Sequence, residues 1–593
     1  MFNKYPINPV RQLFPEHPLS KGYEALTEQI LASLDEKAGS PALIIVDGTH
    51  GADFQSFVRT AAAAIEKQGW SLNVQSTAGY LKSGETLREQ FERNITDNRA
   101  IGYVTEAGIE SFFDSDARAS VSSRLESLSG KTASIVFGPG AYWLAGERSS
   151  AFFYLDVSRE YQQVQHKKQL LSFGMSWNRD SVEKYKISYF VEWPILENYR
   201  KRIFQNIGLY VDMNKPEQPV FANIADMAAM IRSVAQGPLR VKPFFAPGIW
   251  GGQYLKDMAD LPKEWVNCAW GFEPIAPENS ILIGCGGDVI EVPFLIVMAL
   301  EHMAIMGERP VSLFGDYFPV RFDYLDTMDG DNLSCQVHPK QEYVREHFNE
   351  FMTQQESYYI MERQNDAKVY LGFTEGTEKE VFEDAVIQAQ ETGVPMKFTE
   401  YVNEFDANKG DLFLIPPGTV HCSGIDNLVL EVSSTTWWFT FKLYDYLRKD
   451  LDGKPRPINA DHGFRNIDYD KTTSWVKENL IPEPRLLQSQ GGNEEYLLGQ
   501  RDDLLFYVGR IHLQTEWRDH TNGEFVMFNL VEGESVRIVS LADESVYVDL
   551  NYAESYILPS VFGEYKLVNR TKQPCKLIKA GVSPEWNVSL LER

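Results

Sequence analysis

The order of hydrophobic and polar residues divides the chain into three parts of different character. In the first part, apolar residues recur at helical spacing over residues 22–36 and 53–67, and the apolar run 41–48 between them ends in glycine. Such a run, bounded by turn residues, is typical of a parallel strand buried on both faces. Further predicted elements are apolar strands at Ile101–Val104, Ala133–Phe137 and Ala151–Leu155 and a helix at Trp193–Asn206. This alternation predicts an α/β domain with a mostly parallel sheet over residues 1–235.

The second and third parts carry the pattern of β proteins. Residues 236–490 begin at the chain-breaking Gln236-Gly237-Pro238 and contain many short apolar segments, aromatic residues and Gly/Pro turns. They predict a β-barrel or sandwich with helical insertions, one of them a helix at Lys340–Met352. Residues 491–593 alternate like a β meander, with strands expected at Leu504–Val508, Gly523–Leu530, Ser535–Ser540, Ser545–Leu550 and Glu564–Asn569.

Composition narrows the classes of function. The 593 residues hold 57 Lys+Arg against 83 Asp+Glu, a formal charge of −26, which is opposite to that of a protein that binds nucleic acid along a duplex. The five cysteines form no CxxC pair, and the first residues show no signal segment, so we expect a cytoplasmic protein. The most apolar stretch, Phe294–Leu300, is far shorter than the ~20 residues of a membrane helix. We therefore expect no nucleic acid and no membrane as partners, and the sequence makes no prediction of an oligomeric state.

One segment presents a histidine in a recurrent setting. Residues 410–421 read GDLFLIPPGTVH, in which a glycine turn enters an apolar strand and a Pro-Pro-Gly corner precedes His421. A histidine at the start of a strand after such a corner can direct a ring nitrogen into a barrel interior. The spacing of glycine, proline and histidine matches the second cupin motif, against the alternative that His421 only packs beside a turn.

Three upstream residues can complete a metal site with His421. Gln336 and His338 are two apart, so on a strand their side chains share a face. Glu356 follows 18 residues later, after the predicted helix and at the head of a strand-like segment. Two histidines, one glutamate and one glutamine oxygen make a mixed nitrogen and oxygen set that suits a catalytic Zn²⁺.

Taken together and in order, these motifs resemble a known family over residues 240–590. The chain resembles the class I, zinc-dependent, cupin-type mannose-6-phosphate isomerases in the segments Ile249-Trp250-Gly251-Gly252, CAWGFE at 268–273, LSCQVHP at 333–339, GDLFLIPPGTVH, LVLEV at 428–432, LYDY at 443–446 and DGKPR at 452–456. The resemblance implies two jelly-roll barrels, of which residues 236–490 form the metal-binding one. It also implies Gln336, His338, Glu356 and His421 as ligands of Zn²⁺, and a small phosphosugar as the substrate.

The chain departs from this family where charge matters for catalysis. The family has a lysine two residues before the zinc glutamate, where this chain has Gln354, and an arginine before the LYDY segment, where this chain has Lys442. Lys340, Arg448 and Arg456 are alternative contacts for a phosphate or an enediolate. For the proton-transfer base the candidates are Glu431 and Asp445. The predicted catalytic residues are Lys442, Lys340 and Glu431.

The first and third parts of the chain each resemble a known domain in modified form. Residues 491–593 have a turn at Leu558–Tyr565 without a ligand histidine, and are predicted to be a degenerate second cupin. In the first part, Asp47–Phe54 stands where a P-loop stands in the uridine-kinase-like nucleotide kinases, which it resembles in placement. Gly51-Ala52-Asp53 replaces the lysine-containing end of that loop, and an aspartate there repels phosphate. We expect a kinase-like domain that is inactive in phosphate transfer, and no nucleotide cofactor.

Two hypotheses of function follow. The first is a zinc-dependent isomerase that interconverts mannose 6-phosphate and fructose 6-phosphate through an enediol. The alternative is a non-catalytic sensor that binds a sugar phosphate, or an isomerase of a different phosphosugar, and it is motivated by Gln354 and by the broken P-loop.

Overall fold

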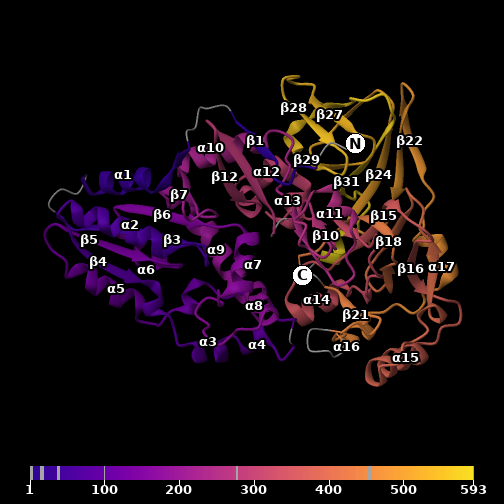
Figure 1. Ribbon diagram of the computed structural model, residues 1–593, viewed down its shortest axis with the longest axis horizontal. Coiled ribbons are helices and arrows are strands. Elements are labelled where there is room, and N and C mark those ends of the chain that lie inside the picture. Colours follow the sequence, from indigo (N-terminus) through magenta and orange to yellow (C-terminus); the bar gives the residue numbers. More distant parts are fainter. Residues whose placement is uncertain are drawn as a thin grey trace. The chain divides into compact units, whose positions relative to one another are not determined.

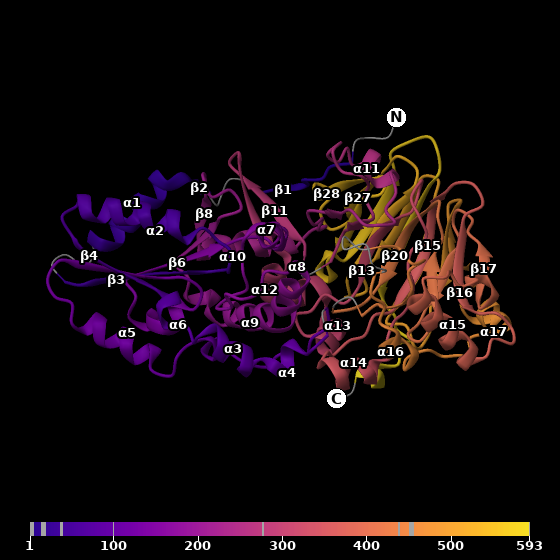
Figure 2. The same cartoon turned by 60° about the horizontal axis from the view of Figure 1, so that its bottom comes forward.

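The computed structural model of the protein describes residues 5–13, 19–35, 40–98, 100–275, 278–436, 439–449 and 456–591. The described residues do not include Trp437 and Trp438, which lie shortly before the LYDY segment. They also do not include residues 452–455 of the DGKPR segment. The chain divides into an α/β unit, Val10–Val234 with Ser280–Leu300, and a β-rich unit, Met1–Pro9 with Ala235–Asn279 and Glu301–Arg593. Figures 1 and 2 show both units.

The α/β unit is built on a sheet of seven strands. Their order is β2 (Ser20–Lys21), β8 (Val220–Asn223), β7 (Leu209–Asp212), β6 (Ala151–Asp156), β3 (Ala42–Gly48), β5 (Thr132–Phe137) and β4 (Ser71–Ser76). The five strands from β7 to β4 pair in parallel, whereas β8 and β2 are antiparallel to their neighbours. The strands predicted at 41–48, 133–137 and 151–155 are confirmed as β3, β5 and β6. Every residue of β3 is buried, as expected of a central strand.

The helices on this sheet follow the predicted spacing. The predictions at 22–36, 53–67 and 193–206 correspond to α1 (Gly22–Asp35), α2 (Phe54–Lys67) and α9 (Trp193–Ile203), which has proline in its first turn. The apolar faces of α1 and α2 pack in one core with β3, β5 and β6. The other helices are α3 (Gly84–Gln90), α4 (Glu92–Ile95), α5 (Ala117–Glu126), α6 (Ala141–Ala145), α7 (Arg159–Lys168), α8 (Ser181–Ile187), the π-helix η4 (Ser188–Glu192) and α10 (Ile224–Ala235).

The strand predicted at Ile101–Val104 is wrong. This segment has irregular backbone, and its amide groups bond outside the sheet: Tyr103 donates to the carbonyl oxygen of Asn94 at 2.9 Å. Ile101 and Gly102 are nevertheless buried, so the segment is apolar because it packs against helices. β4 lies at one edge of the sheet. The hydrophobic pattern did not predict this strand, because its sequence is largely polar.

A buried aspartate holds together the loops at the end of β3. Asp47 accepts hydrogen bonds from the amides of Gly48, Gly140 and Tyr142 at 2.7, 3.0 and 2.8 Å, and from the hydroxyl of Tyr199. It thereby joins β3, the turn before α6, and α9. Burial raises the pKa of Asp47 to about 6. At Gly48 a side chain is excluded, because a Cβ would lie 2.1 Å from the carbonyl oxygen of Leu155.

An Asp47→Ala substitution is expected to lower the free energy of unfolding by about 3 kcal/mol, because it leaves several buried donors without an acceptor. Urea unfolding of the full chain measures the loss. As a matched control, the side chain of the exposed Asp116 on the same unit accepts a hydrogen bond from the nearby Ser120, and Asp116→Ala should change stability by less than about 0.5 kcal/mol. Equal effects of the two substitutions would contradict the role assigned to Asp47.

The segment Ser280–Leu300 returns to the α/β unit from the middle of the β-rich sequence. It contains β11 (Ser280–Cys285) and β12 (Asp288–Pro293), which form a three-stranded sheet with β1 (Val10–Gln12). The sequence prediction includes this segment in the 236–490 part, because its β pattern does not show which hydrophobic core the strands pack in. The apolar stretch at the end of this segment, Phe294–Leu300, begins α12 (Phe294–Met306). No helix among the described residues has the length and apolar character that crossing a membrane requires.

The β-rich unit contains two pairs of antiparallel sheets. In the first pair, one sheet has the order β18 (Leu412–Ile415), β15 (Glu356–Arg363), β20 (Asn427–Ser433), β13 (Arg321–Asp326), β10 (Trp270–Phe272) and β9 (Phe244–Ala246). Its companion has the order β17 (Val402–Asp406), β16 (Lys368–Phe373), β19 (His421–Ser423), β14 (Cys335–Val337) and β21 (Phe441–Tyr444). The helix expected at 340–352 is observed as α14 (Gln341–Phe348). The other α-helices of this unit are α11 (Tyr254–Met258), α13 (Glu308–Phe314), α15 (Lys379–Thr392), α16 (Ala460–Phe464) and α17 (Thr473–Asn479).

The second pair of sheets lies in the C-terminal part. One sheet runs β22 (Arg485–Gln490), β23 (Asn493–Gly499), β24 (Phe506–Leu513), β31 (Cys575–Val582), β26 (Val526–Glu532) and β29 (Ser555–Leu558). The other runs β25 (Glu516–His520), β30 (Glu564–Asn569), β27 (Ser535–Ser540) and β28 (Tyr547–Asn551). Large apolar side chains, among them Trp517, Phe528 and Tyr565, fill the space between these sheets. The multidomain architecture with cupin-like β parts therefore agrees with the sequence prediction.

Candidate metal centre

Three strands of the first pair of sheets bring the predicted ligands together. Gln336 on β14 is the direct partner of His421 at the start of β19. His338 follows the end of β14, and Glu356 is the first residue of β15. The Pro-Pro-Gly corner fixes this arrangement, since the amide of Gly418 donates to the carbonyl oxygen of His338 at 2.9 Å. A larger residue cannot replace Gly418, because its φ is +81° and a Cβ would lie 2.6 Å from Asp468.

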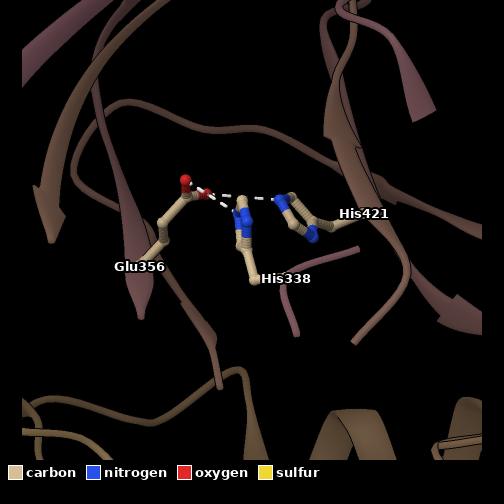
Figure 3. A group of neighbouring side chains, drawn as sticks. All are labelled: His338, Glu356 and His421. Atoms are coloured by element: carbon tan, nitrogen blue, oxygen red, sulfur yellow. Dashed lines mark ion pairs between the residues drawn. The ribbon is translucent and has the colours of Figure 1, made fainter. Parts of the chain in front are cut away.

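His338, Glu356 and His421 form a compact buried cluster (Figure 3). The Nε2 of His338 lies 2.8 Å from one carboxylate oxygen of Glu356, and the Nε2 of His421 lies 3.2 Å from the other. The ligand atoms of all three residues are within 4.8 Å of one another. Both imidazoles are fully buried, and the carboxylate is 2% exposed. Charged and polar atoms at this depth require partners.

Hydrogen bonds to the backbone orient both rings. The Nδ1 of His338 lies 2.9 Å from the carbonyl oxygen of Phe439, and the Nδ1 of His421 lies 2.8 Å from that of Thr419. A carbonyl oxygen only accepts, so each Nδ1 donates, and in a neutral ring Nε2 then offers its lone pair. Burial lowers the pKa of His421, which favours the neutral ring.

This donor set fits a metal ion. Although the distances are short, neither Nε2 of His338 nor Oε2 of Glu356 has a partner in hydrogen-bond geometry among the described residues. Two lone pairs directed at a carboxylate repel it unless a cation lies between them. Burial alone would raise the pKa of Glu356. Positive charge on His338 would hold this pKa well below its usual range, and a cation bound between neutral rings would act on the carboxylate in the same direction. Carbonyl-bonded imidazoles and a carboxylate are typical ligands of a divalent metal.

The predicted fourth ligand lies next to this cluster. The amide nitrogen of Gln336 is 3.3 Å from Nε2 of His421. A half-turn of the amide group exchanges its nitrogen and oxygen, and the oxygen is the atom that binds metals. Coordination by Gln336 stays a prediction.

A row of acidic residues shares the face of the sheet that carries Glu356. Asp323 on β13 is the direct partner of Glu431 on β20, and Glu431 is the partner of Tyr358 on β15. Tyr358 is two residues from Glu356, so all four side chains share one face. Burial raises the pKa of Asp323 and of Glu431 well above the usual range, and the charge of Glu356 adds to both shifts. The tyrosine hydroxyl is buried and has no hydrogen-bond partner within the described parts of the chain.

The predicted cationic residues lie in different settings. Lys340 caps the start of α14, is about half exposed, and forms an ion pair with Asp468 at 2.5 Å. Lys442 on β21 is the direct partner of Gln336. Arg448 and Arg456 both pair with the buried Asp445. The structure thus places Lys442 beside the metal cluster and engages the other three cations elsewhere.

Sequence reasoning missed Asp323 and Tyr358. A signal was present in both cases: Arg321 and Asp323 alternate with Phe322 and Tyr324, which is the pattern of a strand with one polar face. What the sequence did not indicate is that β13 and β15 both pair with β20, which places the polar face of each strand beside Glu431.

Gln354, which stands where the resembling family has lysine, bonds the metal cluster directly. Its amide nitrogen donates to Glu356 Oε1 at 2.5 Å. Gln354→Leu is therefore expected to weaken zinc affinity about 10-fold to 100-fold, since partners that orient ligands contribute this much. Competition with a chromophoric chelator measures the affinity. The exposed Gln388 on α15 provides the control, and Gln388→Leu should leave the affinity unchanged. Unchanged affinity in Gln354→Leu would show that this hydrogen bond does not orient Glu356.

Comparison with known proteins gives a match to one family model and matches to individual relatives and solved structures. A domain of unknown function (DUF8485) matches residues 22–236, which cover most of the α/β unit. The mannose-6-phosphate isomerase ManA of Bacillus subtilis is 29% identical over 331 residues, which are 56% of this chain and 95% of the relative. The mannose-6-phosphate isomerase of Streptococcus mutans is 27% identical over 247 residues, 40% of this chain and 72% of the relative. The crystal structure of the mannose 6-phosphate isomerase from Bacillus subtilis aligns with 58% of this chain and all of that chain, at 20% identity and a TM-score of 0.47.

Proposed function

We propose that the β-rich unit is a zinc-dependent aldose–ketose isomerase that interconverts mannose 6-phosphate and fructose 6-phosphate. The convergence of His338, Glu356 and His421 on one buried point carries this proposal. Relatives named mannose-6-phosphate isomerases, one of them matched over 95% of its length, support the reaction and the substrate.

Each side chain of the cluster has a distinct part in holding the ion. His338 and His421 would bind through Nε2, Glu356 through its carboxylate, and Gln336 through its amide oxygen. When bound, zinc supplies the positive charge that stabilises an oxyanion on the oxygens of the substrate. The carbonyl groups of Phe439 and Thr419 keep both rings in the required tautomer.

The proton transfer is assigned to Glu431. Its carboxylate removes the proton from carbon 2 of the open-chain aldose, the C–H electron pair forms the C1–C2 double bond, and the carbonyl oxygen gains a proton to complete the enediol. Protonation of carbon 1 by Glu431, together with loss of the hydroxyl proton on the oxygen of carbon 2, then forms the C2 carbonyl group and gives the ketose. The raised pKa of Glu431 makes its carboxylate a stronger base than an exposed glutamate. We assign Lys442 to the phosphate or the enediolate, and Lys340 to the phosphate after it exchanges its partner Asp468.

The test of this proposal is a coupled assay. The purified full chain, with zinc, is given mannose 6-phosphate, and fructose 6-phosphate is converted to a coloured product. We expect turnover of mannose 6-phosphate. A chelator should abolish this turnover, and added zinc should restore it. Bound zinc without turnover of mannose 6-phosphate would reject the isomerase.

A second candidate is a sensor that binds a sugar phosphate without turnover. The observation in its favour is that Gln354 brings no charge where the resembling family has lysine, and that Arg448 and Arg456 are both paired with Asp445. Tight binding of mannose 6-phosphate to the zinc-loaded chain, without conversion, would support the sensor.

For the α/β unit we propose a kinase-like domain without phosphate transfer. Asp53, at the place of the P-loop lysine, caps α2 by accepting a hydrogen bond from the amide of Ser56 at 2.9 Å. The negative charge at this helix start opposes an incoming phosphate. Failure of ATP to bind in calorimetry is the expected result, and saturable binding would contradict it.

A further inference from the structure

The α/β unit has a buried polar cluster at the carboxyl ends of β3 and β6. These strands are neighbours, and the chain leaves β3 for the side of β4 and leaves β6 for the side of β7. Ligands of open α/β sheets bind where the connections diverge in this way. Asp156 ends β6, and Thr49, in the loop after β3, donates a hydrogen bond to it. The loop that lacks a phosphate-binding lysine therefore still forms one wall of a polar site.

The helices after β6 supply side chains whose hydrogen bonds are incomplete. Six side chains that are more than nine-tenths buried carry a nitrogen or oxygen without a hydrogen-bond partner among the described residues: Arg159, His166, Ser188, Glu192, Trp193 and Arg200. They lie on α7, on η4 and on α9, which follows η4 directly in the chain; Figures 1 and 2 show α7 and α9 in the same part of the α/β unit. Native proteins seldom bury unpartnered polar atoms, so this concentration indicates that another molecule completes these bonds.

Contacts between these side chains join them into one site. The guanidinium of Arg159 lies 3.5 Å from the centre of the Trp193 ring and donates to Glu197. Burial lowers the pKa of His166 to about 4, and the charges of Glu192 and Arg159 act on it as well. Arg200 approaches Asp156 at 3.5 Å, which extends the cluster to the end of β6.

The backbone at this place is also unusual. Residues Ser188–Glu192 form a π-helix between α8 and α9, and Glu192 is its last residue. Short π-helical turns are rare and occur frequently at functional sites. One carboxylate oxygen of Glu192 accepts a hydrogen bond from the amide of Phe173 at 2.9 Å, while the other has no partner in the described residues.

The unmade hydrogen bonds define the chemistry of the missing partner. Nε of Arg159, Nε of Arg200 and Nε1 of Trp193 are donors, whereas the free oxygen of Glu192 is an acceptor. An anion would satisfy the donors but would meet the carboxylates of Glu192 and Asp156. A hydroxyl group both donates and accepts, so several hydroxyls on one molecule can satisfy the whole set.

We propose that the α/β unit binds a neutral polyhydroxylated ligand, a free sugar, through Arg159, Glu192, Trp193 and Arg200. The sugar lies at the carboxyl ends of β3 and β6, and its hydroxyls accept from the two guanidinium groups and the indole and donate to Glu192. This site is separate from the metal cluster of the β-rich unit and does not depend on its activity.

The test uses the full chain carrying His421→Ala, so that the metal cluster does not contribute. Calorimetric titrations with D-mannose, D-glucose and D-fructose probe the neutral class, and inorganic phosphate probes the anionic class. Saturable binding of at least one hexose, and none of phosphate, is expected. Binding of phosphate alone, or of none of the four probes, would overturn the proposal.

Two substitutions locate the binding site. Trp193→Phe keeps the ring but removes the indole donor, and Glu192→Gln removes the charge at nearly constant volume. Each should weaken hexose binding about tenfold or more, because a hydrogen bond to a buried polar group is lost. A far-ultraviolet circular dichroism spectrum and a urea-unfolding midpoint unchanged from the parent chain verify that these variants fold. Folded variants that bind hexose as tightly as the unaltered chain would overturn the assignment.

Discussion

A His421→Ala variant should lose its bound metal and its isomerase activity together. The Nε2 of His421 is one of two imidazole nitrogens that face Glu356, and its neighbour on β19, Cys422, points to the opposite face of the strand. We expect zinc to fall from about one ion per chain to almost none, and kcat/KM to fall at least about 1000-fold, because charge stabilisation by a metal contributes several kcal/mol to such reactions. Metal analysis after dialysis and the coupled assay measure the two quantities on one sample.

The control for this variant is another histidine of the same unit. His520 is exposed at the end of β25, and His520→Ala should keep full zinc content and full activity. If His421→Ala retained its zinc, the metal would have to lie elsewhere. If it lost zinc but kept its turnover, the metal would not take part in the reaction.

Glu431→Gln should separate metal binding from proton transfer. The glutamine keeps the volume of the side chain but cannot take a proton, so kcat should fall about 100-fold to 10,000-fold. Zinc content should stay the same, because Glu431 is outside the cluster of His338, Glu356 and His421. Steady-state kinetics and hydrogen–deuterium exchange at carbon 2 of the substrate measure the step.

The exposed Glu380 on α15 provides the matched control, and Glu380→Gln should leave kcat unchanged. Asp323→Asn then tests the alternative base, since Asp323 is the cross-strand partner of Glu431. A Glu431→Gln variant with normal kcat would move the assignment to Asp323. Loss of zinc in Glu431→Gln would instead show that the glutamate supports the ligands.

The metal cluster could be predicted because each of its residues depends on local sequence. Strand geometry places Gln336 and His338 on one face, and the Pro-Pro-Gly corner presents His421. The pairing of Gln336 with His421 then follows from two short strands in one sheet. Asp323 and Tyr358 were missed because cross-strand neighbours are set by register, and register depends on long-range packing.

The same distinction explains the errors in the fold. Residues 101–104 are apolar because they pack on helices, whereas β4 is a polar strand at the edge of the sheet. An apolar run indicates that a segment is buried, but it does not indicate which other segment packs against it. For the same reason the pattern could not assign Ser280–Leu300 to the α/β unit.

The central claim is that one buried set of nitrogen and oxygen ligands holds zinc, and X-ray absorption at the zinc edge tests it most directly. The purified chain should show a first shell of nitrogen and oxygen atoms at about 2.0–2.1 Å, with the outer-shell scattering of two imidazoles. Cys335 and Cys422 adjoin Gln336 and His421 in sequence, and both thiols are buried and free. A sulfur shell at about 2.3 Å, or the absence of zinc from the active protein, would contradict the account.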